Sequence, residues 1–228
     1  MENLVEESFN SILDLFKQNI FNTVMFNNQS EKQLRKIHDG AYSIAIWKNE
    51  INSDEQINEI LSNSIQILHI GVFKDGKVTA ILTRNIIDNF LKYLKRTCEI
   101  VGVNYTTDLY TKLKKYFDEK NLKIVKDKLI EIWGVYQSSS DYVHSTNSNN
   151  LSLFNNVKSY STKQVDLNYK SEVTNLEKVL KAINFILIIL EPNKYDKMDK
   201  SIREFIFSYN SEDSKAIIRE HFYKVKIR

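Results

Sequence analysis

The chain has 228 residues, of which 42% are hydrophobic, and a formal net charge of +3 at pH 7, so it carries enough apolar material for a sizeable core. One proline and five glycines are too few for the frequent turns of a many-stranded sandwich. The single cysteine excludes an internal disulfide and a cysteine-based zinc site, and it favours a reducing, cytoplasmic location. The composition therefore predicts an all-α fold.

Apolar residues recur at helical spacing in the first third of the chain. They predict a first helix over residues 2–21 and, after a cap at Ser30, a second helix that reaches about Asn49. A third helix is expected from about Asp54 to Phe73. The tight turn Lys74-Asp75-Gly76-Lys77 then sets the next helix antiparallel to the third.

The fourth helix is expected from about Lys77 to Val101, and its faces differ sharply in polarity. One broad face is apolar and carries Ile86, Ile87, Phe90, Leu91, Leu94, Cys98 and Val101. The opposite face is polar and carries Asn85, Asn89, Lys92 and Arg96. Arg84 and Asp88 fall at the border between the two faces, four residues apart.

The second half of the chain also has the residue pattern of helices. Further helices are expected at Thr107–Glu119, Leu122–Tyr142, Lys170–Leu190, Ser201–Tyr209 and Ser214–Lys226, with Pro192 stopping the third of these. The Ser/Asn-rich segment 138–168 is expected to be a loop. With no clear linker, we predict one antiparallel bundle of about six to nine helices over residues 1–228, with a core at about 54–190 and a C-terminal helical appendage at 191–228.

Two further observations bear on location. The acidic start of the chain does not have the pattern of a secretory signal. The strongest apolar run, Val179–Leu190, is about half the length needed to span a bilayer and is interrupted by Lys181 and Asn184. We interpret it as a buried helix and expect no membrane partner.

Positive charge is concentrated in two segments. Lys112–Lys128 holds seven lysines against three acids, and Lys215–Arg228 holds five basic residues against one glutamate. Such segments attract phosphates, and neighbouring rings can stack on bases. Solvated helix faces explain the same charges, and this interpretation is the more economical one.

Arg84 and Asp88 form the first candidate site. Their spacing permits an ion pair on one helix face, and the guanidinium fork of a half-buried arginine can hold a phosphate or carboxylate. The alternative is that Arg84 and Asp88 only satisfy each other between helices. His144 is the second candidate, because a histidine titrates near neutral pH and can act as general acid or base. A structural role for His144 is equally compatible with its place at a helix end.

Other chemistries have little support in the sequence. Ser140, Asp141 and His144 lack the nucleophile elbow and spacing of a hydrolase triad. The remaining histidines have no metal-ligand spacing, so no metal is expected. Gly76-Lys77 lacks the earlier glycine of a phosphate-binding loop, and no cofactor is expected.

Two segments, taken in order, carry a resemblance. They are Thr83-Arg84-Asn85-Ile86-Ile87-Asp88-Asn89-Phe90 and Trp133-Gly134-Val135-Tyr136-Gln137-Ser138-Ser139-Ser140-Asp141-Tyr142-Val143-His144. The pattern resembles the HEPN-like helical proteins of bacterial defence islands and abortive-infection systems, over roughly residues 54–190. The resemblance implies an antiparallel helical bundle, a homodimer, and, in active members, metal-independent RNA cleavage by an arginine and a histidine at one helix end.

This chain departs from that pattern, because no arginine precedes His144 at the family's spacing of four to six residues. Cleavage would require Arg84 to reach His144 from a neighbouring helix, with Asp88 orienting Arg84. Substrate contacts would then come from Asn85, Ser140, Tyr142, Lys92 and Arg96. The resemblance implies a phage-defence or toxin-like stress-response protein that acts on or binds RNA or a nucleotide. The alternative is a non-catalytic helical adaptor that binds another protein, such as an antitoxin or a phage component.

Overall fold

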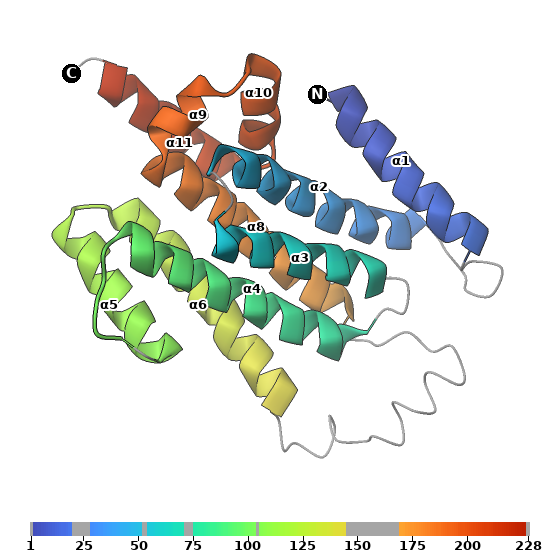
Figure 1. The fold of residues 1–228 in the computed structure, drawn as a ribbon, viewed down its shortest axis with the longest axis horizontal. Coiled ribbons are helices and arrows are strands. Elements are labelled where there is room, and N and C mark those ends of the chain that lie inside the picture. The colour runs from blue at the N-terminus through green and yellow to red at the C-terminus, as the bar shows by residue number, and fades with distance from the viewer. Residues whose placement is uncertain are drawn as a thin grey trace.

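The computed structural model describes residues 2–19, 28–51, 54–70, 75–103, 105–144 and 169–226. Every regular element within them is a helix, which confirms the all-α prediction (Figure 1). The helices are α1 (Glu2–Asn19), α2 (Asn28–Glu50), α3 (Glu55–Ile70), α4 (Gly76–Thr97), α5 (Thr106–Glu119), α6 (Lys123–His144), α8 (Tyr169–Leu190), α9 (Pro192–Lys197), α10 (Lys200–Ser208) and α11 (Glu212–Lys226). The ten described helices exceed the expected number because α9 was not predicted.

Aspartate side chains fix the starts of α3 and α4. The Oδ1 atom of Asp54 accepts a hydrogen bond from the backbone N–H of Ile57 at 3.0 Å, and Asp75 does the same for Val78 at 3.0 Å. Each bond satisfies an amide that the first helical turn leaves without a partner. The two helices form the expected antiparallel pair (Figure 1). Local sequence was therefore sufficient to place this hairpin.

The C-terminal end of α4 differs from the prediction. The helix ends at Thr97 because Glu99 adopts a left-handed backbone conformation with φ of 54°. The N–H of Ile100 then donates to the carbonyl of Lys95 at 2.8 Å, which closes the helix end. Val101 therefore lies beyond the helix and is 81% exposed, so its assignment to the apolar face was wrong. The usual signal for such an ending is glycine, and position 99 carries none.

α6 is longer than expected and absorbs part of the predicted loop. It continues to His144, so the segment from Ser138 to His144 is helical. The Ser138 hydroxyl donates to its own helix at the carbonyl of Val135 (3.0 Å), and Ser139 is fully buried. Packing thus overrides the weak helix propensity of consecutive serines. The rest of the expected loop, residues 145–168, lies outside the described residues.

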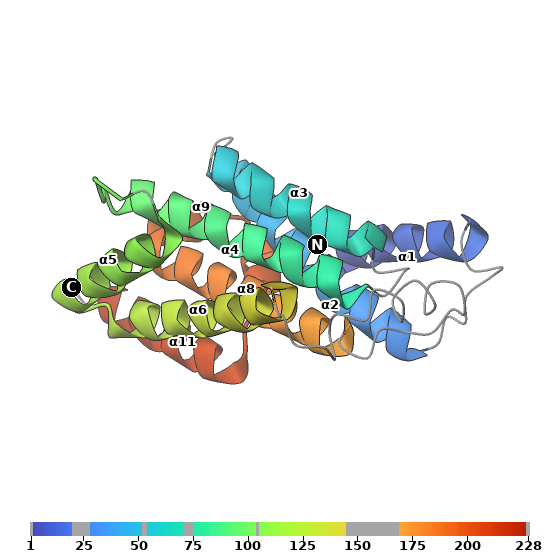
Figure 2. The same cartoon turned by 90° about the horizontal axis from the view of Figure 1, so that it is seen from below.

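α8 forms the centre of the bundle, with α2, α4 and α6 packed around it (Figures 1 and 2). Asn184, which interrupts its apolar run, is fully buried and satisfied. Its Oδ1 accepts hydrogen bonds from Ser43 Oγ and Trp47 Nε1, each at 2.8 Å, and its Nδ2 donates to the carbonyl of Ile206 at 2.9 Å. One side chain thereby joins α2, α8 and α10. In the described parts of the chain, no helix has the length and apolarity to cross a membrane.

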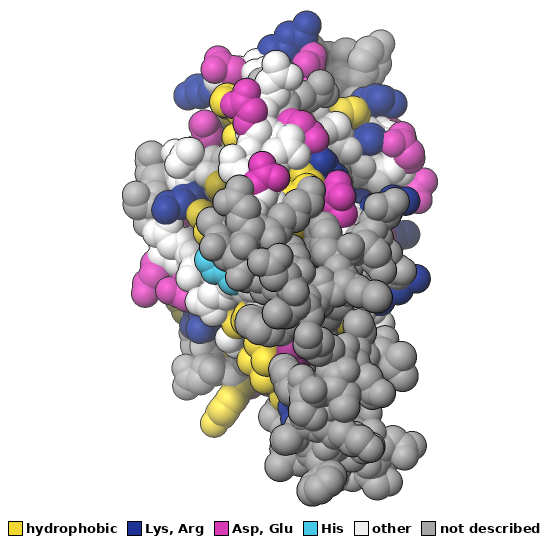
Figure 3. Space-filling model, turned by 90° about the vertical axis from the view of Figure 1, so that its right-hand side faces the viewer, with side chains coloured by type: hydrophobic (Ala, Val, Ile, Leu, Met, Phe, Trp, Pro, Cys, Tyr) yellow, Lys and Arg dark blue, Asp and Glu magenta, His cyan; other side chains and the backbone are white. Residues whose placement is uncertain are grey.

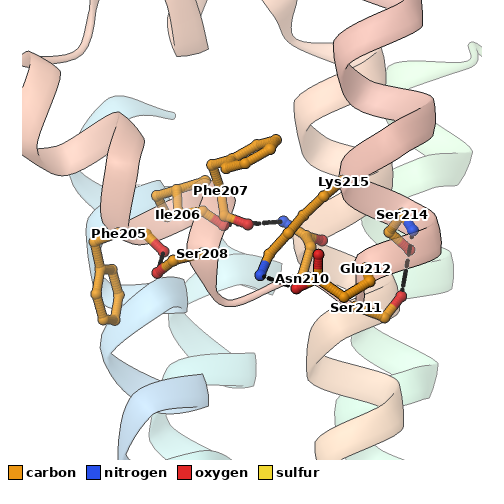
Figure 4. Close-up of polar contacts among 9 residues, drawn as sticks. All are labelled: Phe205, Ile206, Phe207, Ser208, Asn210, Ser211, Glu212, Ser214 and Lys215. Carbon is orange, nitrogen blue, oxygen red and sulfur yellow. Dashed lines mark hydrogen bonds and ion pairs between the residues drawn. The ribbon is translucent and has the colours of Figure 1, made fainter.

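The segment after α8 packs back on the bundle. Pro192 ends α8 and also begins α9, where a missing amide N–H is tolerated. Figure 4 shows the turn between α10 and α11, where Asn210 Nδ2 donates to the same Ile206 carbonyl at 2.9 Å. Ile206 and Ile218 are buried in the common core. The expected C-terminal appendage therefore contributes to the core of the body.

Candidate functional site

Arg84 lies where α4 and α6 pack in antiparallel directions (Figure 2). Its guanidinium carbon is 5.2 Å from the centre of the Tyr136 ring. That ring stacks on Trp133 at 4.8 Å, and Trp133 stacks on Tyr110 at 4.3 Å, with the planes nearly parallel in both pairs. All four side chains are half-buried. The arginine thus ends a continuous stack of three rings.

The local sequence explains only part of this stack. Trp133 and Tyr136 are three residues apart on α6, so they share a helix face. Tyr110 comes from α5, and only the packing of α5 on α6 brings it there. Lys114 Nζ lies 5.8 Å from the centre of the Tyr110 ring. The stack therefore carries a cation at each end, and it ties α4, α5 and α6 together.

Asp88 makes its described hydrogen bond to the start of α5. Its Oδ1 accepts a hydrogen bond from the Thr106 hydroxyl at 2.9 Å, at the first residue of α5. Burial raises the pKa of Asp88, and this effect outweighs the opposing influence of the Thr106 hydrogen bond and of the Arg84 and Lys92 charges. Asp88 thus fastens α5 to α4, and the nearby Arg84 charge acts on its carboxylate.

Arg96, expected as a substrate contact, is engaged in the fold. Its guanidinium binds the carboxylate of Asp54 and donates to Gln56 Oε1 at 2.7 Å. It thereby joins the end of α4 to the capped start of α3. Arg96 also lies about 18 Å along the helix axis from Arg84, which is too far for both to hold one phosphate. Lys92 and Asn85 are exposed on the outer face of α4, as expected.

The serine-rich end of α6 faces a carboxylate that the sequence prediction missed. Ser139 Oγ donates to Glu172 Oε2 at 3.4 Å, and Glu172, on α8, is only 6% exposed. Ser140 and Tyr142 are half-buried nearby on α6. A signal for Glu172 was present, because it shares a helix face with the apolar residues Tyr169, Val173 and Leu176.

His144 is the last residue of α6, and its side chain lies outside the described residues. Its backbone is eight residues beyond Tyr136, which is about 12 Å along the helix axis. Ser140 lies between them, one turn from Tyr136 and on a similar face. Of the predicted site residues, Ser140 thus lies one turn from the ring that Arg84 contacts, whereas Asp88, Lys92 and Arg96 follow Arg84 along α4 in the opposite direction.

The surface charges of the described residues are largely mixed. In the first basic segment, Lys126 pairs with Asp118 at 2.5 Å and Lys128 with Glu131 at 2.8 Å. Figure 3 shows acidic and basic side chains interspersed over the upper part of one face. Among the described side chains, His, Cys, Asp and Glu form no group of three that could hold a metal ion. The candidate site is therefore best defined by Arg84 and its ring stack.

Comparison with known proteins adds no family assignment. No family model, no curated protein and no solved structure matches the chain.

Proposed function

We propose that this protein binds or acts on RNA or a nucleotide in a phage-defence or toxin-like stress response, with Arg84 as the phosphate-binding group. The observation that carries the proposal is the position of Arg84 on the Tyr136 ring. A guanidinium seated on a ring is oriented by one face while its N–H groups remain in the plane for hydrogen bonding. Phosphate oxygens suit that fork, because two parallel charge-assisted hydrogen bonds can form.

The catalytic form of the proposal assigns one role to each of two residues. The ribose 2′-oxygen bonds to phosphorus and the P–O5′ bond breaks, which leaves a 2′,3′-cyclic phosphate and a 5′-hydroxyl. His144 removes the 2′-hydroxyl proton or protonates the leaving 5′-oxygen, water makes the other proton transfer, and Arg84 stabilises the negative charge on the phosphorane. Asp88 is assigned a positioning role through Thr106, since its described hydrogen bond holds α5 against α4. Both Arg84 and His144 side chains must contact the same phosphodiester for this chemistry.

Labelled RNA tests the proposal directly. Wild type, Arg84→Ala and His144→Ala are compared for cleavage, and the same RNA is used in an anisotropy assay for binding. Arg219→Ala is the matched control. Arg219 is on α11, away from α4 and α6, and its guanidinium carbon also lies over an aromatic ring, 5.0 Å from the centre of the Phe207 ring. We expect Arg84→Ala to lose binding and His144→Ala to lose cleavage while binding persists. Equal RNA cleavage and equal RNA binding in all four proteins would contradict the proposal.

A non-enzymatic adaptor is the second candidate, and the loop after α4 favours it. Lys95 Nζ donates to the carbonyl of Val103 at 2.8 Å, and Lys112 Nζ donates to that of Val101 at 3.2 Å. The loop is thus braced while Val101 and Tyr105 stay 81% and 72% exposed. Braced and exposed apolar side chains suit a contact with another protein.

Growth assays separate the two candidates. If the nucleic-acid function is correct, Arg84→Ala relieves growth arrest upon expression and leaves the fold intact. If the adaptor function is correct, Val101→Ser with Tyr105→Ser abolishes the phenotype, whereas Arg84→Ala only lowers the melting temperature. Circular dichroism on each purified variant provides the stability measurement that both outcomes require.

A further inference from the structure

A second pocket, remote in sequence from Arg84, lies where α2, α8 and α10 meet. Its volume is about 380 Å³, within the usual range for small organic ligands. Its charged lining consists of four cations, Lys32, Arg35, Lys36 and Lys181, and two acids, Asp39 and Glu177. Positive charge therefore prevails in this pocket, although the chain as a whole is almost neutral.

The cations come from regular helix faces. Lys32, Arg35 and Lys36 are three and four residues apart on α2, and Lys181 follows Glu177 by one turn on α8. Lys36 Nζ lies 2.6 Å from one oxygen of Glu177, and Lys181 Nζ lies 2.8 Å from the other. Two ammonium groups thus share one carboxylate. These hydrogen bonds lower the pKa of Glu177 against the opposing effect of burial, so Glu177 remains ionised at neutral pH.

The other two cations differ from each other. Arg35 forms two hydrogen bonds with Glu6, at 2.7 and 2.8 Å, and lies 3.9 Å from the Phe9 ring centre, so α1 holds it in place. Lys32 is exposed, and none of the described carboxylates lies within ion-pair distance of it. Because Arg35 is paired with Glu6, three lysines face the two carboxylates Glu177 and Asp39, which leaves one positive charge uncompensated at the pocket. An anionic ligand would neutralise it.

α10 supplies an aromatic wall. Figure 4 shows the Phe205 ring directed toward the α2 ribbon, whereas the Phe207 ring points away from it. The Phe205 ring also contacts Tyr42 edge-on, with 5.5 Å between ring centres. Tyr209, which follows the last residue of α10 and lies one turn beyond Phe205, presents its ring to Lys181 Nζ at 5.7 Å. A planar group can therefore pack beside the cations.

The hydroxyl of Tyr209 lies inside the wall of the pocket, against Gly40 of α2. It is buried without a hydrogen-bond partner among the described residues, which is costly for a polar group. Gly40 permits this position, because a Cβ there would lie 2.7 Å from the hydroxyl oxygen. Burial, reinforced by the charges of Glu177 and Asp39, raises the pKa of Tyr209, so the hydroxyl keeps its proton and adds no negative charge to the pocket.

We propose that the pocket between α2, α8 and α10 binds an organic polyphosphate of nucleotide size, with its phosphates on Lys32, Lys36 and Lys181 and its planar ring against Phe205. The site does not include Arg84 and does not depend on the function assigned to it. The shared chemistry is that of phosphate esters and anhydrides. ATP, inorganic tripolyphosphate and adenosine are therefore the probes that separate the contribution of the phosphates from that of the ring.

Isothermal titration calorimetry with the full chain tests the site. We expect saturable binding of ATP, weaker binding of tripolyphosphate, no measurable binding of adenosine, and an affinity that falls with added NaCl. The double variant Lys32→Ala/Lys36→Ala should weaken ATP binding about tenfold or more, since phosphate contacts are charge-assisted. The control Lys48→Ala/Lys170→Ala removes the same charge from α2 and α8 outside the pocket, and it should keep the wild-type affinity.

Two more measurements define the outcome. Phe205→Ala should weaken ATP but leave tripolyphosphate unchanged, which also shows that the variant is folded. Lys32→Ala/Lys36→Ala should bind labelled RNA like wild type, so failure of this site and failure of the proposed function are distinguishable. The proposal is overturned by an absence of saturable ATP binding, by equal affinity for ATP and tripolyphosphate, or by equal losses in the two double-lysine variants.

Discussion

The guanidinium of Arg84 lies over the ring of Tyr136, with 5.2 Å between the guanidinium carbon and the ring centre. This contact joins α4 to α6. It connects the two segments that carry the resemblance described above, the one that begins at Thr83 and the one that begins at Trp133. It also places the only arginine of the candidate site at the end of the stack formed with Trp133 and Tyr110. The contact can stabilise the fold and bind a ligand at once. Its contribution to the free energy of unfolding must therefore be measured separately.

A double-mutant cycle isolates that share. Arg84→Ala, Tyr136→Leu and the double variant are compared by urea denaturation. We expect a coupling free energy of about 0.5–1 kcal/mol, as for a partly exposed cation over a ring. A coupling near zero would show that the two side chains are adjacent without stabilising each other. Lys120→Ala with Tyr116→Leu is a control pair, because the Lys120 ammonium lies 5.8 Å from its ring at the exposed end of α5.

Asp88→Asn should alter the pH dependence of stability. Because burial raises the folded-state pKa of Asp88 above its usual value, the folded protein binds this proton more tightly than the unfolded chain. Asp88 therefore lowers stability as pH rises from its unfolded pKa through the raised folded pKa, and the loss is complete at neutral pH. Asparagine keeps the acceptor for Thr106 without the charge. We expect a higher melting temperature for Asp88→Asn at pH 7, with the difference shrinking toward low pH.

The same scan includes Asp213→Asn as a control, because Asp213 is exposed in the first turn of α11. A pH-independent difference between Asp88→Asn and wild type would contradict the assigned role of burial.

Asn184→Leu should be strongly destabilising. It removes the two bonds that Asn184 Oδ1 accepts and the one that its Nδ2 donates, and it leaves the indole N–H of Trp47 buried without an acceptor. Buried groups left unpaired cost about 1–3 kcal/mol each, so we expect a total loss of roughly 3 kcal/mol or more. Urea denaturation measures it, with the exposed Asn193→Leu as control. A loss below about 1 kcal/mol would mean that leucine packing compensates for the lost network.

Cys98 should react slowly with thiol reagents in the folded protein. Its side chain is 8% exposed, and burial raises its pKa to about 11, against the opposing hydrogen bond with Tyr116. Few thiolates are therefore present at neutral pH, and those few are covered. We expect labelling by a chromogenic disulfide to follow the urea unfolding transition. Immediate stoichiometric labelling in native buffer would show that the end of α4 opens readily.

Part of the candidate site could be predicted from the sequence and part could not. The border position of Arg84 and Asp88 follows from counting residues around one helix, and the structure confirms that both are half-buried. Their neighbours come from other helices. Thr106 reaches Asp88 from α5 and Tyr136 reaches Arg84 from α6, and helical periodicity holds no information about such pairs.

The sequence by itself determined the helices and several of their ends. Apolar spacing sets the period of a helix, and Asp54 and Asp75 cap their helices through bonds to amides three residues away. These are local interactions, so local sequence suffices. The end of α4 was mispredicted for a local reason, since the left-handed residue Glu99 is not a glycine and gives no signal in the sequence. Tertiary structure alone decided that Ser139 is buried against Glu172 and which helices Asn184 joins. Those outcomes depend on burial and hydrogen bonds between segments distant in the chain, and their free energies exceed the weak helix propensities on which a sequence-based prediction relies.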